Sequence, residues 1–220
     1  MRRSLASAVA LAASALLLIG CTSAPSSAGP STAHTATPSP TPSATAEIEP
    51  QVVVSLDGIA VTDESGTRRA DFADLDAFLN LVGEVAGGLP EPEKVEDPPG
   101  YEFKMVNYTW DGLKVFTNTA HDAPASVAIT GPSLNGVPIM TEEGVAVGST
   151  REELIDAGAW ALDDAEDPRT AEFVGVGGRE APGTKSLTHP GSVGIIFTLV
   201  WFDGDVVKQI QVPSNDYSDI

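Results

Sequence analysis

The chain has 220 residues, of which 31 are acidic and 12 are basic, so its formal net charge is −19 at pH 7. A surface this acidic repels nucleic acid and anionic lipid, which excludes the usual nucleic-acid-binding classes. High acidity is commonly a solubility feature, although it can also attract a basic partner. With a single cysteine the chain can form no internal disulfide, so its stability must come from packing.

The first 20 residues have the three parts of an export signal. Arg2 and Arg3 introduce the apolar run ALAASALLLIG, and Gly20 is the small residue at the cleavage position. A transmembrane helix needs about 20 apolar residues, and this run is shorter. We therefore expect residues 1–20 to act as a signal peptide that is removed.

The cysteine follows directly, and the segment Leu18-Ile19-Gly20-Cys21 resembles the lipobox of bacterial lipoproteins. That resemblance implies that the Cys21 thiol carries a diacylglycerol group and becomes the new N-terminus after cleavage. Two acyl chains attach a protein stably to a membrane, whereas one binds reversibly. We expect an extracytoplasmic protein, lipid-anchored to the outer face of the bacterial cell membrane. The alternative is an ordinary secretory signal followed by a buried cysteine.

The segment that follows the cysteine predicts a tether. Residues 22–46 are rich in Ser, Thr, Ala and Pro, with almost no charge and no large apolar side chain. Such a segment cannot bury enough surface to offset its ordering entropy. We predict that residues 21–46, beginning with the lipidated Cys21, form a disordered linker that spans about 25–30 Å on average.

The rest of the chain predicts an α+β fold, built as a tandem of two similar units over residues 47–120 and 121–220. In each unit a tryptophan, then Asp-Gly, separates two β-rich runs, at Asp111-Gly112 and at Asp203-Gly204. Asp-Gly between apolar runs is typical of a two-residue hairpin turn. Each unit is therefore predicted to pack one helix on an antiparallel sheet that contains such a hairpin.

The first unit has two predicted strands and one long helix. Strands are expected near residues 52–56 and 59–62, around a turn. Apolar residues recur at helical spacing over residues 72–86, which predicts an amphipathic helix. Asp71 is the expected N-cap, and Gly87 is expected to end the helix.

The second unit has a shorter predicted helix. Strands are expected near residues 127–130 and 144–147. Thr150 can cap the helix that follows, and Glu153 can close a capping box three residues later. The apolar face of this helix is expected to extend to Ala161, with Trp160 as a further candidate for that face, although Gly158 weakens the helix.

This second unit is similar to a known repeat. Residues 144–154, GVAVGSTREEL, are followed some fifty residues later by residues 200–207, VWFDGDVV. Together they resemble the small helix-plus-sheet repeat of outer-membrane-assembly lipoproteins and of the β-lactamase inhibitory protein. The resemblance implies helices packed on an antiparallel sheet and a function in binding proteins rather than in catalysis. It is weaker in the first unit, where Asp71 and Phe72 replace the Gly-x-Thr entry.

Candidate catalytic residues are scarce. His121, Asp122 and Ser126 could together form a hydrolase site, but no Gly-x-Ser-x-Gly elbow accompanies them. Turns beside prolines account for both His121 and His189. No pair of residues has zinc-ligand spacing. We therefore expect a protein that is not an enzyme and that has no metal and no cofactor.

Two further patterns contain residue types that are found in ligand-binding sites. The acidic stretches at residues 163–167 and 215–219 lack the spaced carboxylates of an EF-hand loop, so we expect solvated loops. The glycines within residues 175–178 are not followed by Lys-Ser or Lys-Thr, so they do not predict a phosphate loop. They predict a flexible turn.

Trp110 and Trp201 precede the two predicted turns at equivalent positions. We interpret both as core residues, each packed on the helix of its own unit. If they point outward instead, they are candidate binding anchors, because exposed tryptophans often dominate binding surfaces.

The anchor, the tether, the repeat and the lack of catalytic groups favour a non-enzymatic binding or envelope-maintenance lipoprotein with a protein partner in the cell envelope. A second hypothesis is a protein inhibitor of the β-lactamase-inhibitory type, which predicts an exposed concave sheet lined by aromatic side chains. A third is an extracytoplasmic hydrolase centred on His121.

Overall fold

The computed structural model describes residues 48–96, 99–100, 102, 104–121, 123–162 and 167–217. The predicted signal peptide, Cys21 and the tether lie outside the described residues, as do Asp122 and most of the acidic stretch at 163–167. The described residues belong to one compact unit. Across the described residues, that unit has a mixed α/β fold, made mostly of strands arranged in two sheets, with two helices.

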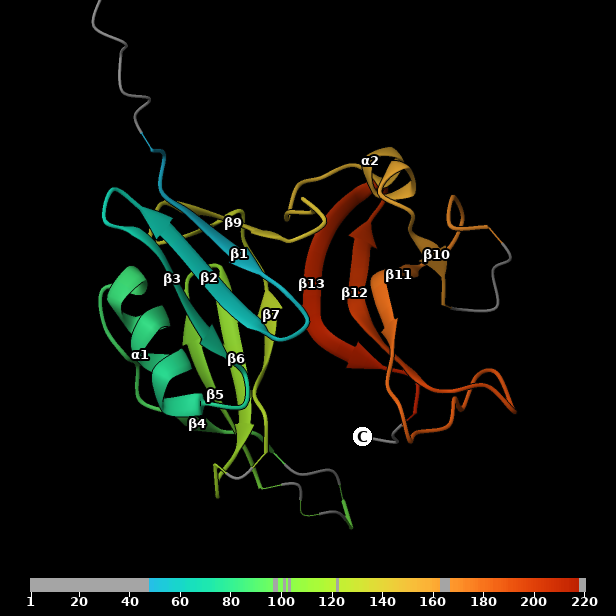
Figure 1. Cartoon of the computed structure of the whole chain (residues 1–220), viewed down its shortest axis with the longest axis horizontal. Helices are drawn as coiled ribbons and strands as arrows, with labels where there is room; N and C mark the ends of the chain where they lie inside the picture. The colour runs from blue at the N-terminus through green and yellow to red at the C-terminus, as the bar shows by residue number, and fades with distance from the viewer. Residues whose placement is uncertain are drawn as a thin grey trace, which may run out of the picture. The chain divides into compact units, whose positions relative to one another are not determined.

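The smaller sheet has the strand order β3-β2-β1-β9-β8 (Figure 1). Its strands are β1 (Gln51–Val54), β2 (Gly58–Asp63), β3 (Gly66–Asp71), β8 (Ser133–Leu134) and β9 (Val137–Thr141). β1 pairs antiparallel with β2 and parallel with β9, so a strand from the second half of the chain completes a sheet begun by the first.

The first helix, α1 (Leu75–Ala86), lies against β2 and β3 of this sheet (Figure 1). Its N-cap is Asp74, whose side chain accepts a hydrogen bond from the backbone N–H of Ala77. The predicted start at residue 72, capped by Asp71, was three residues early, because β3 continues to Asp71. The predicted end is confirmed: Gly87 has φ 84°, the left-handed conformation that closes many helices.

The larger sheet is antiparallel and has the strand order β10-β11-β12-β13-β7-β6-β5-β4. Its strands are β4 (Glu93–Lys94), β5 (Met105–Trp110), β6 (Leu113–Asn118), β7 (Ser126–Ile129), β10 (Trp160–Ala161), β11 (Phe173–Glu180), β12 (Ile195–Asp203) and β13 (Val206–Asn215). β7 pairs with both β6 and β13. The two tryptophan-containing segments therefore belong to one continuous sheet.

Both tryptophan-containing segments form pairs of adjacent antiparallel strands. In the first, Trp110 pairs with Leu113 across Asp111 and Gly112. In the second, Asp203 pairs with Val206, so the two turn residues are Gly204 and Asp205. The predicted turn at Asp203-Gly204 was thus one residue early. β13 is strongly curved (Figure 1), and the register between β12 and β13 shifts twice.

The second helix, α2 (Arg151–Asp156), is short. The predicted capping box is confirmed, since Thr150 and Glu153 each accept a hydrogen bond from the other's backbone N–H. The expected apolar face does not extend further: within the helix only Leu154 is buried, and Trp160 and Ala161 form the strand β10 instead. Gly158, with φ 88°, redirects the chain between the helix and this strand.

One core joins the helices and both sheets. It contains α1 residues such as Phe78, smaller-sheet residues such as Val52 and Ile139, and larger-sheet residues such as Val115 and Ile210, all fully buried. The larger sheet therefore has one face on this core, which we call the inner face. The opposite side is the outer face.

Candidate binding surface

The strand registers assign side chains to the two faces of the larger sheet, because directly paired residues in an antiparallel sheet point to the same side. One row runs through Val174, Val200, Ile210, Ile129, Leu113 and Trp110. The first five of these are at most 1 % exposed. This row lies on the inner face.

The neighbouring row lies on the outer face and runs through Trp160, Gly175, Leu199, Gln211, Ala128, Lys114 and Thr109. A second, shorter outer row contains Phe173, Trp201 and Gln209. Most of these side chains are half-buried, and the aromatic ones gather over β10, β11 and β12. The outer face therefore presents rings and amides rather than a uniformly polar surface.

The charge of this surface differs from that of the chain. The two outer rows contain Lys114 and no carboxylate, although acidic residues outnumber basic ones by 31 to 12. Acidic side chains that the registers place on the outer face stand at strand ends, at Glu93, Glu180 and Asp203. A surface kept clear of the prevailing charge is compatible with contact to a neutral partner.

Trp160 is the aromatic residue that sequence reasoning missed. Its indole ring lies over Gly175 and Gly178 of β11, where a Cβ at Gly178 would come within 2.8 Å of the ring and one at Gly175 would overlap it. It also meets Phe197 edge-on, with ring centroids 5.8 Å apart. These glycines were predicted to form a flexible turn, but they lie within β11 and make room for the ring.

A pocket of about 440 Å³ opens beside this ring. It is lined by Trp160, Ala161, Leu162, Thr188, His189, Ile195 and Asp216. The lining combines one indole, three aliphatic side chains, a hydroxyl, an imidazole and a carboxylate. Its volume is within the range of small-molecule sites, about 300–1,000 Å³.

Asp216 organises the polar side of this pocket. Its Oδ1 accepts the backbone N–H of Ile195 at 2.6 Å, and its Oδ2 accepts the hydroxyls of Ser186 at 2.5 Å and Thr188 at 3.3 Å. Burial alone would raise its pKa, but these hydrogen bonds together hold the pKa of Asp216 below its ordinary value. The residue thus stays charged at neutral pH and is not the freely solvated side chain expected for residues 215–219.

His189 lies at the pocket rim, with an exposed side chain. Its Nδ1 is 2.9 Å from Thr188 Oγ1, and its backbone N–H donates to Ser186 Oγ at 2.9 Å. Because the Thr188 hydroxyl donates to the carboxylate, its oxygen is free to accept from Nδ1–H. Within the part of the chain that the structure describes, no hydrogen bond occupies Nε2.

This arrangement suits binding better than nucleophilic catalysis. In a catalytic triad the nucleophile donates to an imidazole that a carboxylate orients. Here the hydroxyls of Ser186 and Thr188 donate directly to Asp216, and no hydroxyl bonds His189 Nε2 among the described residues. The pocket offers a ring and hydrogen-bonding groups held in fixed orientations.

The two predicted anchors, Trp110 and Trp201, lie on opposite faces of the larger sheet. Trp110 packs against the core, stacks with Tyr108 at 6.3 Å, and donates its indole N–H to the Gly88 carbonyl at 2.8 Å. Trp201 lies on the outer face between Phe173 and Gln209. The interpretation of both as equivalent core residues was therefore wrong for Trp201.

The structure does not assemble the hydrolase site considered from the sequence. His121, with φ 54°, borders a hollow at the start of α1 that Asp74 and Asp76 also line. Ser126 lies in β7, on the outer face beside Phe116. No hydrogen bond joins His121 to Ser126 in the described parts of the chain.

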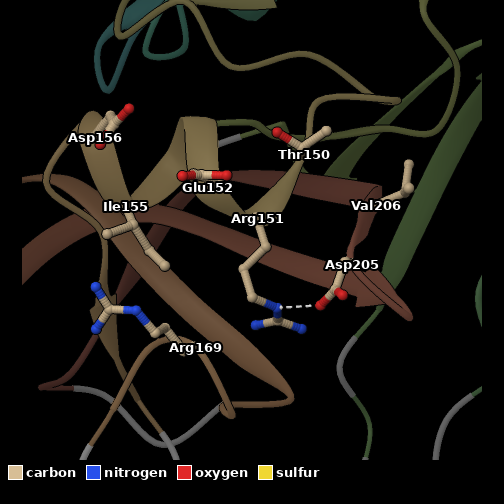
Figure 2. Close-up of a pocket in the computed structure, with 8 residues that line it drawn as sticks. All are labelled: Thr150, Arg151, Glu152, Ile155, Asp156, Arg169, Asp205 and Val206. Atoms are coloured by element: carbon tan, nitrogen blue, oxygen red, sulfur yellow. Dashed lines mark hydrogen bonds and ion pairs between the residues drawn. The ribbon is translucent and has the colours of Figure 1, made fainter. Parts of the chain in front are cut away.

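A larger hollow, of about 600 Å³, lies beside α2 (Figure 2). Arg151 borders it, but its guanidinium is already occupied. It donates to Asp205 at 2.9 Å, to the carbonyls of Pro168 and Ala171 at 2.9 Å each, and to the Gly204 carbonyl at 3.0 Å.

The Arg151 guanidinium also lies 3.8 Å from the ring centre of Phe202. Figure 2 shows it directed at Asp205, with Arg169 standing apart. Arg151 therefore holds α2 to the turn between β12 and β13. Because these contacts engage the Arg151 guanidinium, it is not free to bind an anionic ligand in the hollow.

No protein-family model matches the chain, and no curated protein and no solved structure matches it. Among the residues that the structure describes, no helix is long and apolar enough to cross a membrane. The same residues contain no cluster of three or more potential metal ligands. The assignment of the outer face and its pocket as a binding surface therefore depends on their geometry and chemistry alone.

Proposed function

We propose that the protein is a membrane-anchored, extracytoplasmic lipoprotein that acts as a non-enzymatic binding module in the cell envelope, and that the outer face is its binding surface. One observation supports this proposal. The half-buried aromatic side chains of Trp160, Phe173 and Trp201 gather on the outer face, and the two outer rows hold no carboxylate. Solvent-accessible tryptophans with polar neighbours are typical of binding surfaces.

The anchor is Cys21, with its diacylglycerol group, and residues 22–46 are the tether. The lipobox pattern supports this assignment. Replacing Cys21→Ser removes the thiol that takes the lipid, so the protein is expected in the soluble extracytoplasmic fraction instead of the membrane fraction. Retention of the Cys21→Ser variant in washed membranes would contradict lipid anchoring at this residue.

The tandem of two α+β units, and with it the resemblance to the helix-plus-sheet repeat, also belongs to this proposal. Each half contributes one helix and one hairpin with Asp and Gly in or beside its turn. The pairings of β6 with β7 and of β1 with β9 would then join the two units.

The binding role can be tested by photocrosslinking in intact cells. A photoreactive side chain at Gln209, beside Trp201 on the outer face, should trap an envelope component. The matched control is the same side chain at Glu152, which is exposed on α2. No adduct from Gln209, or the same adducts from both positions, would overturn the proposal.

A protein inhibitor of the β-lactamase-inhibitory type is the second candidate. The adjacent rings of Phe173 and Trp201 favour it, because an aromatic sheet face is what such an inhibitor presents. Inhibition of a purified serine β-lactamase by the full mature chain, weakened by Trp201→Ala, is the expected result. Unchanged enzyme activity at micromolar protein would remove this candidate.

A further inference from the structure

We propose that the pocket beside Trp160 and the adjoining outer rows bind an uncharged glycan chain. This rests on the proposed binding function and names its ligand class. The pocket is a concave site with one aromatic wall and one hydrogen-bonding wall, and its aromatic residue, Trp160, is also the first residue of an outer row that crosses β11, β12 and β13.

The aromatic wall is held in place before any ligand arrives. The Trp160 ring is seated over Gly175 and Gly178 and braced by the edge-on contact with Phe197, so it has little freedom to rotate. Part of the ring faces the pocket. A fixed flat ring suits the apolar C–H face of a sugar, because little side-chain entropy is lost on binding.

The hydrogen-bonding wall is equally preorganised. Ser186, itself only 6 % exposed, and Thr188 both donate to Asp216, and Thr188 in turn contacts the His189 ring. His189 Nε2 therefore has a defined direction. A sugar hydroxyl can both donate and accept, so it can pair with this nitrogen in either tautomer.

The charged groups that line the pocket distinguish among the possible classes of hydroxylated ligand. Among the described residues, no arginine or lysine lines the pocket, and its carboxylate would repel a phosphate or a uronic acid. A cationic ligand is disfavoured as well, because both oxygens of Asp216 already accept hydrogen bonds and it is the one carboxylate among the described residues that line the pocket. The chemistry that remains is neutral and rich in hydroxyls.

The outer rows extend the site beyond one sugar ring. From Trp160 the row continues through Leu199 to Gln211, across β10 to β13, and Trp201 with Gln209 lies alongside. Three strand spacings cover about 14 Å. Over this length the first row offers one ring and one amide, and the second row offers two rings and one amide, which favours a chain of sugars over a monosaccharide.

The test is calorimetric titration of the full lipidated chain in detergent with neutral glucan and mannan oligosaccharides. Uronic-acid oligosaccharides of equal length and an unstructured neutral peptide are the comparators. We expect at least one neutral oligosaccharide to bind, with the charged ones at least about tenfold weaker. Absence of binding by every neutral oligosaccharide at millimolar concentration, or tighter binding of the peptide or the charged glycans, would overturn the proposal.

A matched pair of histidine variants locates the site. His189→Asn should weaken glycan binding about three- to tenfold, the effect of one lost hydrogen bond. His121→Asn changes the same residue type at an exposed position away from the pocket and should leave binding unchanged. Equal affinities for the two variants would place any binding elsewhere and contradict the assignment.

A second pair keeps the test independent of folding. Trp160→Phe retains a ring over the glycines and should keep part of the affinity, whereas Trp160→Leu should lose about tenfold or more, with melting temperatures measured for both. If photocrosslinking at Gln209 traps an envelope component but no glycan binds, the binding function survives and the glycan assignment fails. If glycans bind and nothing is trapped in cells, the cellular function fails instead.

Discussion

The two tryptophan-bearing hairpins share a residue pattern and differ in where they place the tryptophan. In β5–β6, Trp110 faces the core and bonds the Gly88 carbonyl. In β12–β13, Trp201 faces outward while the next residue, Phe202, packs against the core beneath the Arg151 guanidinium. A strand sends neighbouring side chains to opposite faces, so only one of two adjacent aromatics can be internal.

The difference teaches that proximity to a turn does not assign a tryptophan to a face. Trp110 is the last residue before its turn, whereas Phe202 and Asp203 still separate Trp201 from its own. A shift of one residue reverses every side chain in a strand. Partners distant in sequence, such as Arg151 for Phe202, select which residue becomes internal.

The largest expected effect is the contrast in stability between the two tryptophans. Trp110→Ala removes core contacts and leaves the Gly88 carbonyl without its donor, so we expect the free energy of unfolding to fall by about 2–3 kcal/mol. Trp201→Ala should cost about 1 kcal/mol. Chemical denaturation of both variants measures the difference. Equal losses would mean that the two faces are not distinct.

Arg151 should give the next largest effect, because it connects α2 to the turn of the second hairpin. Arg151→Met removes hydrogen bonds to three carbonyls and to Asp205, at a cost of about 2 kcal/mol. Arg169→Met is the control, since Arg169 is exposed. The thermal midpoints of the two variants should differ by several degrees, and identical midpoints would show that the Arg151 contacts contribute nothing.

Asp216, at the end of the second hairpin, should make the free energy of unfolding depend on pH in the acidic range. Its folded pKa lies below the ordinary value of 3.8, so the carboxylate stabilises the fold above that value. This contribution is lost as pH falls through the lowered pKa. Asp216→Asn should cost about 1 kcal/mol near pH 7 and progressively less towards pH 3.

The control for that titration is Asp203→Asn, on an exposed residue of the same hairpin. Denaturation curves collected at several pH values give the comparison. A constant difference between Asp216→Asn and the wild type from pH 7 to pH 3 would contradict the role of the charged carboxylate.

The smallest effect on stability is expected for the ion pair between Arg179 and Asp57. It joins β11, the strand next to the second hairpin, to the turn between β1 and β2. Arg179 donates to both oxygens of Asp57, and this hydrogen bonding with the Arg179 charge lowers the pKa of Asp57. Both side chains are well exposed. Arg179→Gln should therefore change the free energy of unfolding by less than about 1 kcal/mol, and less still in high salt. A larger loss, insensitive to salt, would contradict this assignment to the surface.

Local features of the fold were readable from the sequence. The capping box of Thr150 and Glu153 and the stop at Gly87 were predicted correctly, because each depends on residues within a few positions. The start of α1 was missed by three residues, since Asp71 pairs with Gly58 in β3 before the helix can begin. A competing strand partner, absent from a local pattern, set that boundary.

The residues of the candidate site were much harder to predict from the sequence. Trp160 was only a further candidate for a helix face and Asp216 was expected in a solvated loop, whereas the structure brings them to one pocket with His189. The run of glycines in β11 was the available signal, because closely spaced glycines in a strand often accommodate a large neighbour. Nothing local indicated that the neighbour was Trp160.

By itself, the sequence determined the strongly acidic composition, the single cysteine beside a predicted export signal, and two helix-end signals, the capping box of Thr150 and Glu153 and the stop at Gly87. These follow from residue type and short spacing. Only the tertiary structure decided that both halves share one sheet, that Trp110 is internal while Trp201 is not, and that a pocket forms beside Trp160. Strand pairing joins residues far apart in sequence, and the face that each side chain takes depends on the partner strand and the core it meets.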